Sequence, residues 1–268
     1  MGCNASADAH ETTALSGSLV QYPNPNGKKT VVIVGGGIAG ISAAEGIWDH
    51  ANVVLIDQKD HFEYNPFIVK VAQDEKIPET LFATFEETIK GYNNKFQFVQ
   101  GKLLNVLKEN TIEIQNPVTK SRSHIKYDAL VIATGFLYNN PIKNDNAYSV
   151  TERKGAMQKF NKQVADAKSV LILGGGIVGV ELAGEIAFHP DAANKKITLA
   201  VRGQRLLNQL PEDAHKAADS FLKTKNVEIQ YNVTDFGALK KKFDLVLECF
   251  GQTYKADFLK KSFPSAIA

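Results

Sequence analysis

Two glycine-rich turns constrain the fold of this chain more than any other feature of its sequence. They read Gly35-Gly36-Gly37-Ile38-Ala39-Gly40 and Gly174-Gly175-Gly176-Ile177-Val178-Gly179. Each follows a short apolar run and opens a segment with helical periodicity, the context in which G-x-G-x-x-G predicts a βαβ dinucleotide-binding unit. The first glycine permits a tight turn, the second lets the backbone approach a pyrophosphate, and the third lets helix pack on strand. We therefore expect two dinucleotide sites, at the first glycine turn (residues 35–40) and the second glycine turn (residues 174–179).

The segments around the turns repeat one theme. We expect strand, helix and strand over residues 31–34, 38–48 and 53–56, and again over 170–173, 177–188 and 197–201. Short apolar strands that alternate with helical patterns are typical of parallel sheets. Two such units on one chain predict an α/β protein with an internal repeat.

The residues that close the second strand of each unit differ. Asp57 stands about 20 residues beyond the first turn, where a carboxylate can bind a ribose hydroxyl. The second unit has Val201 at this place, followed by Arg202 and Arg205. A strand end that offers a guanidinium group and no carboxylate favours binding of a ribose 2′-phosphate, and hence of NADPH. The alternative is that both arginines are solvated surface charges.

Further segments complete the two units. The strands YDALVIATG and FDLVLECFG finish at Gly135 and Gly251 and leave room for a bound dinucleotide, although any buried strand can end in glycine. The segments FQFVQGKLLNV, TIEIQ and HIKY predict a small antiparallel meander. Ser149 and Glu152 can form a capping box at the start of the helix that opens a second domain.

Composition excludes several classes of protein. The 268 residues suffice for two domains, and 44% hydrophobic with 22% charged residues is a globular balance. A net charge of +2 spread along the chain gives no footprint for nucleic acid. No apolar run approaches the roughly 20 residues of a membrane span, and no secretory signal is seen. Two distant cysteines, Cys3 and Cys249, predict neither a disulfide framework nor a metal site.

The order GGGIAG, ATG, GGGIVGVELAGE and ECFG resembles the FAD/NAD(P)-binding pyridine nucleotide oxidoreductases, a superfamily that includes glutathione reductase, type II NADH dehydrogenases and apoptosis-inducing factor. The resemblance covers residues 30 to about 260. Disulfide reductases of this superfamily need a cysteine pair beside the flavin, whereas DQKDHFEYNPFIVKVAQ contains none. With the start MGCNAS, that segment is most similar to the apoptosis-inducing factor homologues called ferroptosis suppressor proteins, which are NAD(P)H:quinone oxidoreductases.

The resemblance implies a fold and domain limits. It implies two Rossmann-like three-layer domains, the NAD(P) domain inserted in the FAD domain. We expect a flexible tail over residues 1–27, the first part of the FAD domain over 28–148, the NAD(P)H domain over 149–256, and over 257–268 the start of a segment returning to the FAD domain. The family continues beyond this point to a third FAD motif and a C-terminal domain, so we expect a fragment, an incomplete gene product or a naturally reduced form.

The resemblance also implies roles for single residues. Gly35, Gly36, Gly37, Ile38 and Ala39 match the FAD phosphate turn. Lys70 matches a basic residue that contacts FAD in the family, and Leu103 matches a position whose backbone contacts the adenine. Glu181 matches a carboxylate that lies near the nicotinamide and the flavin. Lys70 and Glu181 are candidates for a charge pair that tunes the flavin, the alternative being a structural ion pair. For the second nucleotide we expect contacts from Gly174, Gly176, Gly179, Glu181, Arg202 and Gly251.

Four other residues are interpreted as packing residues rather than catalysts. His61 and Tyr64 lie near the expected flavin edge, Cys249 ends a buried strand, and Trp48 lies on the first helix. Lone residues of these types more often satisfy a core than carry chemistry.

The first six residues predict a membrane anchor. Met1-Gly2-Cys3-Asn4-Ala5-Ser6 fits N-myristoylation of Gly2, and Cys3 can accept the palmitate needed for stable attachment. A chance match is the alternative. The leading hypothesis is an NAD(P)H:quinone oxidoreductase with FAD on the cytosolic face of a membrane. A soluble flavin or ferredoxin-type reductase with a protein partner, and a non-catalytic NAD(P)H-binding or redox-signalling protein, remain open.

Overall fold

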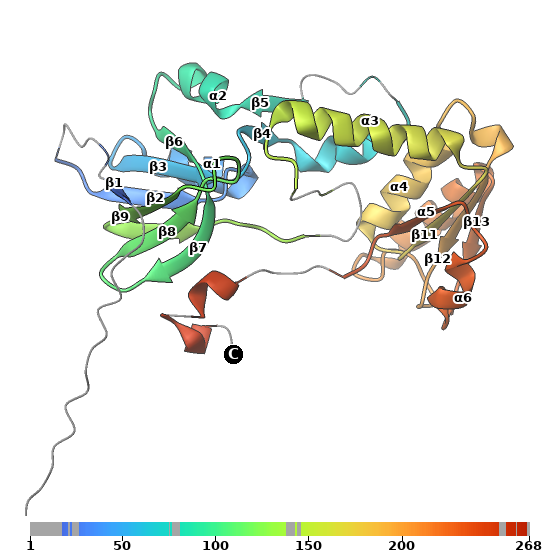
Figure 1. Cartoon of the computed structure of the whole chain (residues 1–268). Helices are drawn as coiled ribbons and strands as arrows, with labels where there is room; N and C mark the ends of the chain where they lie inside the picture. The colour runs from blue at the N-terminus through green and yellow to red at the C-terminus, as the bar shows by residue number, and fades with distance from the viewer. Residues whose placement is uncertain are drawn as a thin grey trace, which may run out of the picture.

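Two parallel sheets form the two ends of the molecule, and a long helix and a 3₁₀ helix lie between them (Figure 1). The computed structural model describes residues 18–20, 22, 27–74, 76, 81–137, 143, 146–251, 256–260 and 262–266. In each sheet, one of the two central strands is followed directly by a glycine turn.

The first parallel sheet has the order β10-β2-β3-β6. Its strands are β2 (Thr30–Val34), β3 (Asn52–Asp57), β6 (Gln97–Gln100) and β10 (Ala129–Ile132). One face packs on α1 (Ile38–Ile47) and α2 (Phe85–Gly91), and the other face packs on a small second sheet. Because side chains alternate along a strand, Ile33 and Leu55 point to the helices while Val32 and Ile56 point to the small sheet. The result is a three-layer domain.

The small sheet corrects two expectations. Its order is β1-β9-β8-β7, with β7 (Lys102–Leu107), β8 (Thr111–Gln115) and β9 (Arg122–Lys126) antiparallel. The first predicted meander segment divides at Gly101, whose N–H donates to the Asp57 carbonyl and where a Cβ would lie 2.8 Å from the Cδ1 atom of Ile114. Its first half is β6 of the parallel sheet. The tail predicted over residues 1–27 contains β1 (Ser18–Val20), which pairs in parallel with β9.

The second parallel sheet has the order β13-β12-β11-β14. Its strands are β11 (Ser169–Leu173), β12 (Lys196–Ala200), β13 (Val227–Gln230) and β14 (Leu245–Glu248). On one face lie α3 (Val150–Asp166), α4 (Ile177–Ala187) and α5 (Glu212–Thr224), and on the other lies α6 (Phe236–Lys240). The predicted capping box of Ser149 and Glu152 starts α3. Helices on both faces of a parallel sheet define a doubly wound α/β domain.

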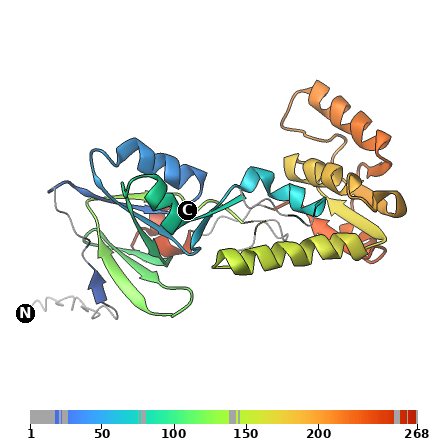
Figure 2. The ribbon, with the colours of Figure 1, turned by 90° about the horizontal axis from the view of Figure 1, so that it is seen from above.

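The two ends are joined by a buried interface. The 3₁₀ helix η1 (Asn65–Ala72) lies in the chain between the paired strands β4 (His61–Glu63) and β5 (Phe82–Thr84), and in Figure 2 it lies beside α4. Its apolar side chains share one core with α3 and α4. The guanidinium of Arg153, fully buried on α3, donates to Glu63 at 2.7 Å. Lys59 donates to the same carboxylate at 2.8 Å. The buried pair of Arg153 and Glu63 therefore links the first half of the chain to the second.

The end of the described chain lies against the first domain. The short helix η4 (Asp257–Leu259) contacts β7, and Phe258 and Leu259 pack on the core between the two sheets of that domain. The turn η5 (Pro264–Ala266) follows. None of the helices in the described part of the chain is long and apolar enough to span a membrane.

Candidate functional site

The first glycine turn is shaped for a phosphate group. Gly35 has a φ of +110°, and a Cβ there would lie 2.2 Å from the Ala133 carbonyl oxygen. A Cβ on Gly40 would lie 1.7 Å from the Gly35 carbonyl oxygen, so the helix approaches the strand as the motif requires. A Cβ on Gly37 would meet nothing within 4 Å. The outer glycines therefore serve internal packing, and the middle one leaves the backbone open to a ligand.

The second glycine turn repeats this geometry. Gly174 has a φ of +113°, a Cβ on Gly179 would lie 1.9 Å from the Gly174 carbonyl oxygen, and Gly176 is open. The N-caps of α1 and α4 are Gly37 and Gly176, which supply no side chain to the first N–H groups of the helices. These donors and the positive end of the helix dipole suit an anion.

An apolar residue is exposed beside each turn. Ile38 and Ile177 open their helices and are 47% and 52% exposed. Each directly follows the open glycine of its turn, so an apolar side chain borders both glycine cradles.

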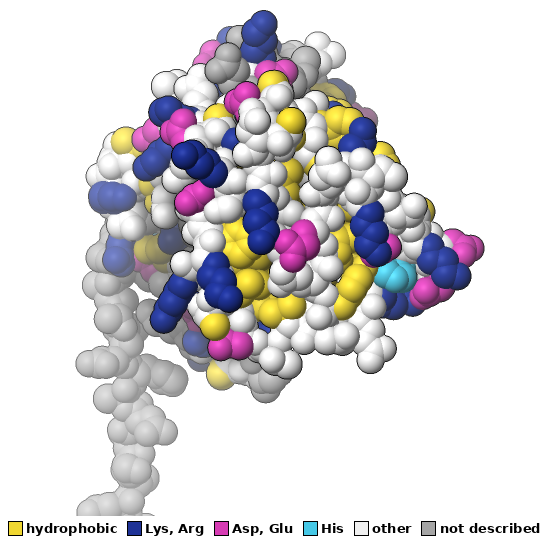
Figure 3. Space-filling model, turned by 90° about the vertical axis from the view of Figure 1, so that its right-hand side faces the viewer, with side chains coloured by type: hydrophobic (Ala, Val, Ile, Leu, Met, Phe, Trp, Pro, Cys, Tyr) yellow, Lys and Arg dark blue, Asp and Glu magenta, His cyan; other side chains and the backbone are white. Residues whose placement is uncertain are grey.

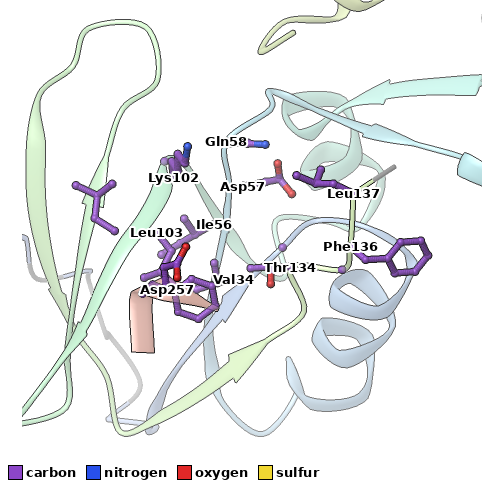
Figure 4. Close-up of a pocket in the computed structure, with 15 residues that line it drawn as sticks. Val34, Ile56, Asp57, Gln58, Lys102, Leu103, Thr134, Phe136, Leu137 and Asp257 are labelled. Carbon is purple, nitrogen blue, oxygen red and sulfur yellow. The ribbon is translucent and has the colours of Figure 1, made fainter. Parts of the chain in front are cut away.

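A cavity of about 330 Å³ lies at the carboxyl ends of β2, β3 and β10 (Figure 4). Four predicted cofactor residues from four segments line it: Gly35, Asp57, Leu103 and Gly135. The remaining lining residues are Val34, Ile56, Gln58, Gly101, Lys102, Leu104, Thr134, Phe136, Leu137, Asp257 and Phe258. The return of residues 257–268 to the first domain was expected, but no single residue of this segment was predicted to line the site, as Asp257 and Phe258 do.

Asp57 is fixed in the cavity wall. Its Oδ2 accepts from the Gly36 N–H at 2.6 Å and its Oδ1 from the Lys59 N–H at 2.8 Å. Burial raises the pKa of this carboxyl, and the two N–H donors oppose the rise. The carboxylate thus ties the end of β3 to the glycine turn and keeps oxygen lone pairs for a ribose hydroxyl. The cavity thus joins the glycine turn at Gly35, the carboxylate of Asp57 and the apolar Leu103, which is the chemistry that the adenosine end of a dinucleotide requires.

The second site has no carboxylate in this place. Val201 is buried, and a Cβ on Gly175 would lie 2.9 Å from both of its methyl carbons. Arg205 is used by its own loop, since it pairs with Glu212 at 2.8 Å and donates to the Leu210 carbonyl. Arg202 is exposed at the end of β12. Gly251, with a φ of +78°, is exposed just beyond β14.

The predicted charge pair between the two sites has a different partner. Lys70 on η1 lies 3.8 Å from the carboxylate of Glu185, and not of Glu181, which is one turn earlier on α4. Burial and the charge of Glu185 raise the pKa of Glu181. The ammonium also lies 5.6 Å from the ring of Phe67, which is half exposed. The spacing of four residues in GVELAGE was the signal for Glu185, because it places both carboxylates on one helix face.

Of the four residues interpreted as packing residues, Trp48, Cys249 and His61 pack in the interior, although the buried Nε2 atom of His61 has no hydrogen-bond partner among the described residues, and Tyr64 is 44% exposed. His61 is buried, bonds Asp60 at 2.7 Å and packs edge-on against Phe82. Trp48 stacks on Phe96 in the core beneath α1. Cys249 is a buried free thiol, and Tyr64 is partly exposed near Phe67.

The predicted lipidation residues are not part of the described structure. Gly2 and Cys3 lie outside the described residues. Within the described ranges no group of three or more His, Cys, Asp or Glu side chains could hold a metal. On the face formed by the second domain, basic and acidic side chains are interspersed with apolar ones (Figure 3).

Two parallel-sheet units, each with an open glycine cradle after a central strand, define a fold with two dinucleotide sites. The sequence model of the pyridine nucleotide-disulphide oxidoreductases matches residues 29–260, and the chain belongs to this family. The superfamily inferred from the sequence is thereby confirmed, and it is a family of pyridine nucleotide-dependent oxidoreductases.

Several curated proteins are similar to this chain. Ferroptosis suppressor protein 1 of Xenopus tropicalis is 29% identical over 201 residues, 74% of this chain and 51% of that protein. The oxidoreductase ptaL of Pestalotiopsis fici is 31% identical over 76% of this chain and 57% of its own length. Apoptosis-inducing factor homolog B of Dictyostelium discoideum is 30% identical over 76% and 52%. The chain therefore spans about half the length of these relatives.

Solved structures confirm the fold class. NDH2 from Plasmodium falciparum in complex with NADH aligns with a TM-score of 0.71 at 19% identity, over 87% of this chain and 58% of that one. NADH:rubredoxin oxidoreductase from Clostridium acetobutylicum aligns with a TM-score of 0.66 at 21% identity, over 88% and 61%. At this identity the likeness concerns the fold alone.

Proposed function

We propose that this chain is an FAD-dependent oxidoreductase that passes hydride from NAD(P)H to FAD and electrons on to a quinone-type acceptor. The observation that carries the proposal is the pair of glycine cradles, each open at its middle glycine, on two domains that pack together through η1 and α4, where Lys70 pairs with Glu185. Hydride transfer between two bound dinucleotides requires positioning rather than a nucleophile.

The chain's own residues supply that positioning. The cavity at Asp57 and Leu103 would hold the ADP half of FAD, whose flavin accepts hydride and releases electrons. The second glycine turn would hold the pyrophosphate of NAD(P)H. Lys70 would place a positive charge beside the flavin, and Glu185 fixes its side chain. These are electrostatic roles, so no side chain is required to form a covalent bond.

The choice of a quinone over a disulfide rests on the cysteines. Residues 57–73, which lead from β3 through η1, contain no cysteine pair, and the Cys249 thiol is buried beside the second glycine turn. The resemblance to ferroptosis suppressor proteins supports a quinone-type acceptor.

The test is the visible absorption spectrum of the purified chain, recorded before and after anaerobic NADPH. We expect flavin bands that NADPH bleaches and a short-chain ubiquinone restores. A chain that takes up no flavin after incubation with FAD, yet still binds NADP⁺, would favour the non-catalytic alternative. Reoxidation by a ferredoxin but not by quinones would favour the reductase with a protein partner.

We further propose attachment to the cytosolic face of a membrane through myristate on Gly2 and palmitate on Cys3, supported by the pattern MGCNAS alone. One acyl chain binds membranes marginally, so two are needed for stable attachment. The full chain should sediment with membranes, Gly2→Ala should become soluble, and Cys3→Ser should attach weakly. An unchanged membrane fraction for Gly2→Ala would refute the anchor and leave a soluble acceptor as the better candidate.

A further inference from the structure

Two arginines follow β12, and the structure separates their roles. Arg205 is held within its own loop by Glu212 and by backbone carbonyls. Arg202 is exposed, and among the described residues its guanidinium makes ring contacts but neither a hydrogen bond nor an ion pair. All five of its N–H donors are thus available to a ligand.

The rings under Arg202 come from two other segments. The guanidinium carbon lies 5.0 Å from the ring centroid of Phe236 and 5.9 Å from that of Phe250. Both distances are within the roughly 6 Å range of a cation–π contact. Phe236 opens α6, whereas Phe250 follows β14, and their centroids are 5.6 Å apart.

The ring pair is rigid because it belongs to a core. Phe236 is buried against Leu171, Leu173 and Ala200, and Phe250 packs on this cluster. The parallel order β12-β11-β14 brings the carboxyl ends of β12 and β14 to either side of the second glycine turn. The platform therefore lies at the edge of the sheet where a dinucleotide binds.

We propose that Phe236 and Phe250 orient Arg202 as the recognition group for a nucleoside 2′-phosphate, so that the second site selects NADPH over NADH. The inference rests on the proposed function, because it requires a pyridine nucleotide on the second glycine turn. Val201 supplies no carboxylate to repel the phosphate or to bind the free ribose hydroxyl of NADH. A stacked guanidinium keeps its N–H fork in the plane and loses less side-chain freedom when it binds a phosphate.

The predicted effects separate charge from orientation. Arg202→Lys keeps the charge but loses the planar fork, and we expect about a tenfold loss of NADP⁺ affinity. Arg202→Glu should reverse the preference. Phe250→Leu should weaken NADP⁺ by a factor of about 3 to 10 and leave NAD⁺ unchanged. Phe236→Leu should do the same, at some cost in stability because the ring is buried.

The matched control is Phe243→Leu. Phe243 packs on the same core cluster and has a cation over its ring, Lys196 at 5.8 Å, but belongs to neither ring contact of Arg202. A merely structural effect of losing a ring should appear in this variant too. We expect Phe243→Leu to lower stability and to leave the ratio of NADP⁺ to NAD⁺ affinity as in the parent.

The experiment is calorimetric titration of the full chain and its variants with NADP⁺ and NAD⁺, and with 2′,5′-ADP and 5′-AMP as probes of the adenosine end. A ratio that falls in both platform variants and not in Phe243→Leu supports the proposal. An unchanged ratio in both platform variants, or in Arg202→Glu, overturns it. Failure of the proposed function looks different: the parent would prefer NADP⁺ through these rings and yet neither hold flavin nor oxidise NADPH. A parent that binds none of the four nucleotides would overturn both.

Discussion

The two glycine turns have nearly the same backbone and quite different surroundings. Both begin with a glycine at a φ near +110°, and both end with a glycine packed on the first. The first is tied to a buried carboxylate, Asp57, and opens into a cavity closed by segments from distant parts of the chain. The second packs on Val201 and is flanked by the exposed guanidinium of Arg202, which lies over two rings.

This difference shows where cofactor choice resides. The turn itself provides N–H donors and open space, which suit any pyrophosphate. Which nucleotide binds is decided by the residue that closes the second strand and by its packing partners. The predictions below test this division of roles.

The largest effect on stability should come from the buried pair of Arg153 and Glu63, which joins the two domains. Arg153→Met leaves Glu63 buried with Lys59 as its remaining partner, and we expect the free energy of unfolding to fall by about 3 kcal/mol or more. Urea unfolding measures this loss. Lys162→Met is the matched control, because it breaks the exposed pair with Asp166 on the same helix and should cost about 0.5 kcal/mol or less. Equal losses of unfolding free energy in the two variants would show that the buried pair of Arg153 and Glu63 stabilises the protein no more than an exposed pair does.

The same pair predicts a dependence on pH. Burial alone would raise the pKa of Glu63, but Arg153 and Lys59 together hold it below the usual value of 4.5. Since the folded pKa lies below the unfolded one, the pair stabilises the protein fully above the unfolded pKa, and this stability is lost as the pH falls through the folded pKa. The stability difference between the parent and Arg153→Met should therefore shrink on acidification, as measured by unfolding between pH 7 and pH 3. A constant difference would contradict this assignment.

Substitutions in the turns should separate the two sites. Gly35→Ala forces a Cβ to within 2.2 Å of a carbonyl oxygen at a positive φ, and should abolish FAD binding with about 1 to 3 kcal/mol of destabilisation. Gly174→Ala should abolish NAD(P)⁺ binding and spare FAD. Gly37→Ala points into open space, so it should weaken FAD without lowering the melting temperature. Flavin content and nucleotide titration check all three, and loss of both cofactors in either single variant would disprove independent cradles.

A smaller effect is expected from Asp57→Asn. The amide keeps the shape of the carboxylate but not its charge-assisted bonds to the Gly36 and Lys59 N–H groups or to a ribose. FAD affinity should fall about tenfold, which corresponds to about 1.4 kcal/mol. NADP⁺ affinity should not change, because the second site uses no such carboxylate. An equal loss at both sites would instead indicate a general loss of structure.

The smallest effect should come from the buried thiol beside the second turn. Cys249→Ser should leave quinone reduction within about twofold of the parent, since the side chain is an inert small group at the end of β14. Neither protein should reduce glutathione disulfide. Disulfide reduction that survives Cys249→Ser together with Cys3→Ser would place the chain in a different branch of its family.

The sequence alone determined the local units. The strands and helices around the turns lie within two residues of their predicted bounds, for example α1 at Ile38–Ile47 against residues 38–48 and β3 at Asn52–Asp57 against 53–56. The capping box at Ser149 and the carboxylate of Asp57 beside the first turn were also predictable. These features depend on residues that are neighbours in the chain or belong to one βαβ unit, so their spacing carries the information.

Tertiary structure decided the rest. It divided one predicted meander strand at Gly101, paired β1 with β9, joined Lys70 to Glu185, and brought Phe258 to the cavity and Phe236 under Arg202. Each of these contacts joins segments from separate elements. Which of them meet follows from how the sheets and helices bury their apolar faces against one another, a property of the packed chain that no local spacing encodes.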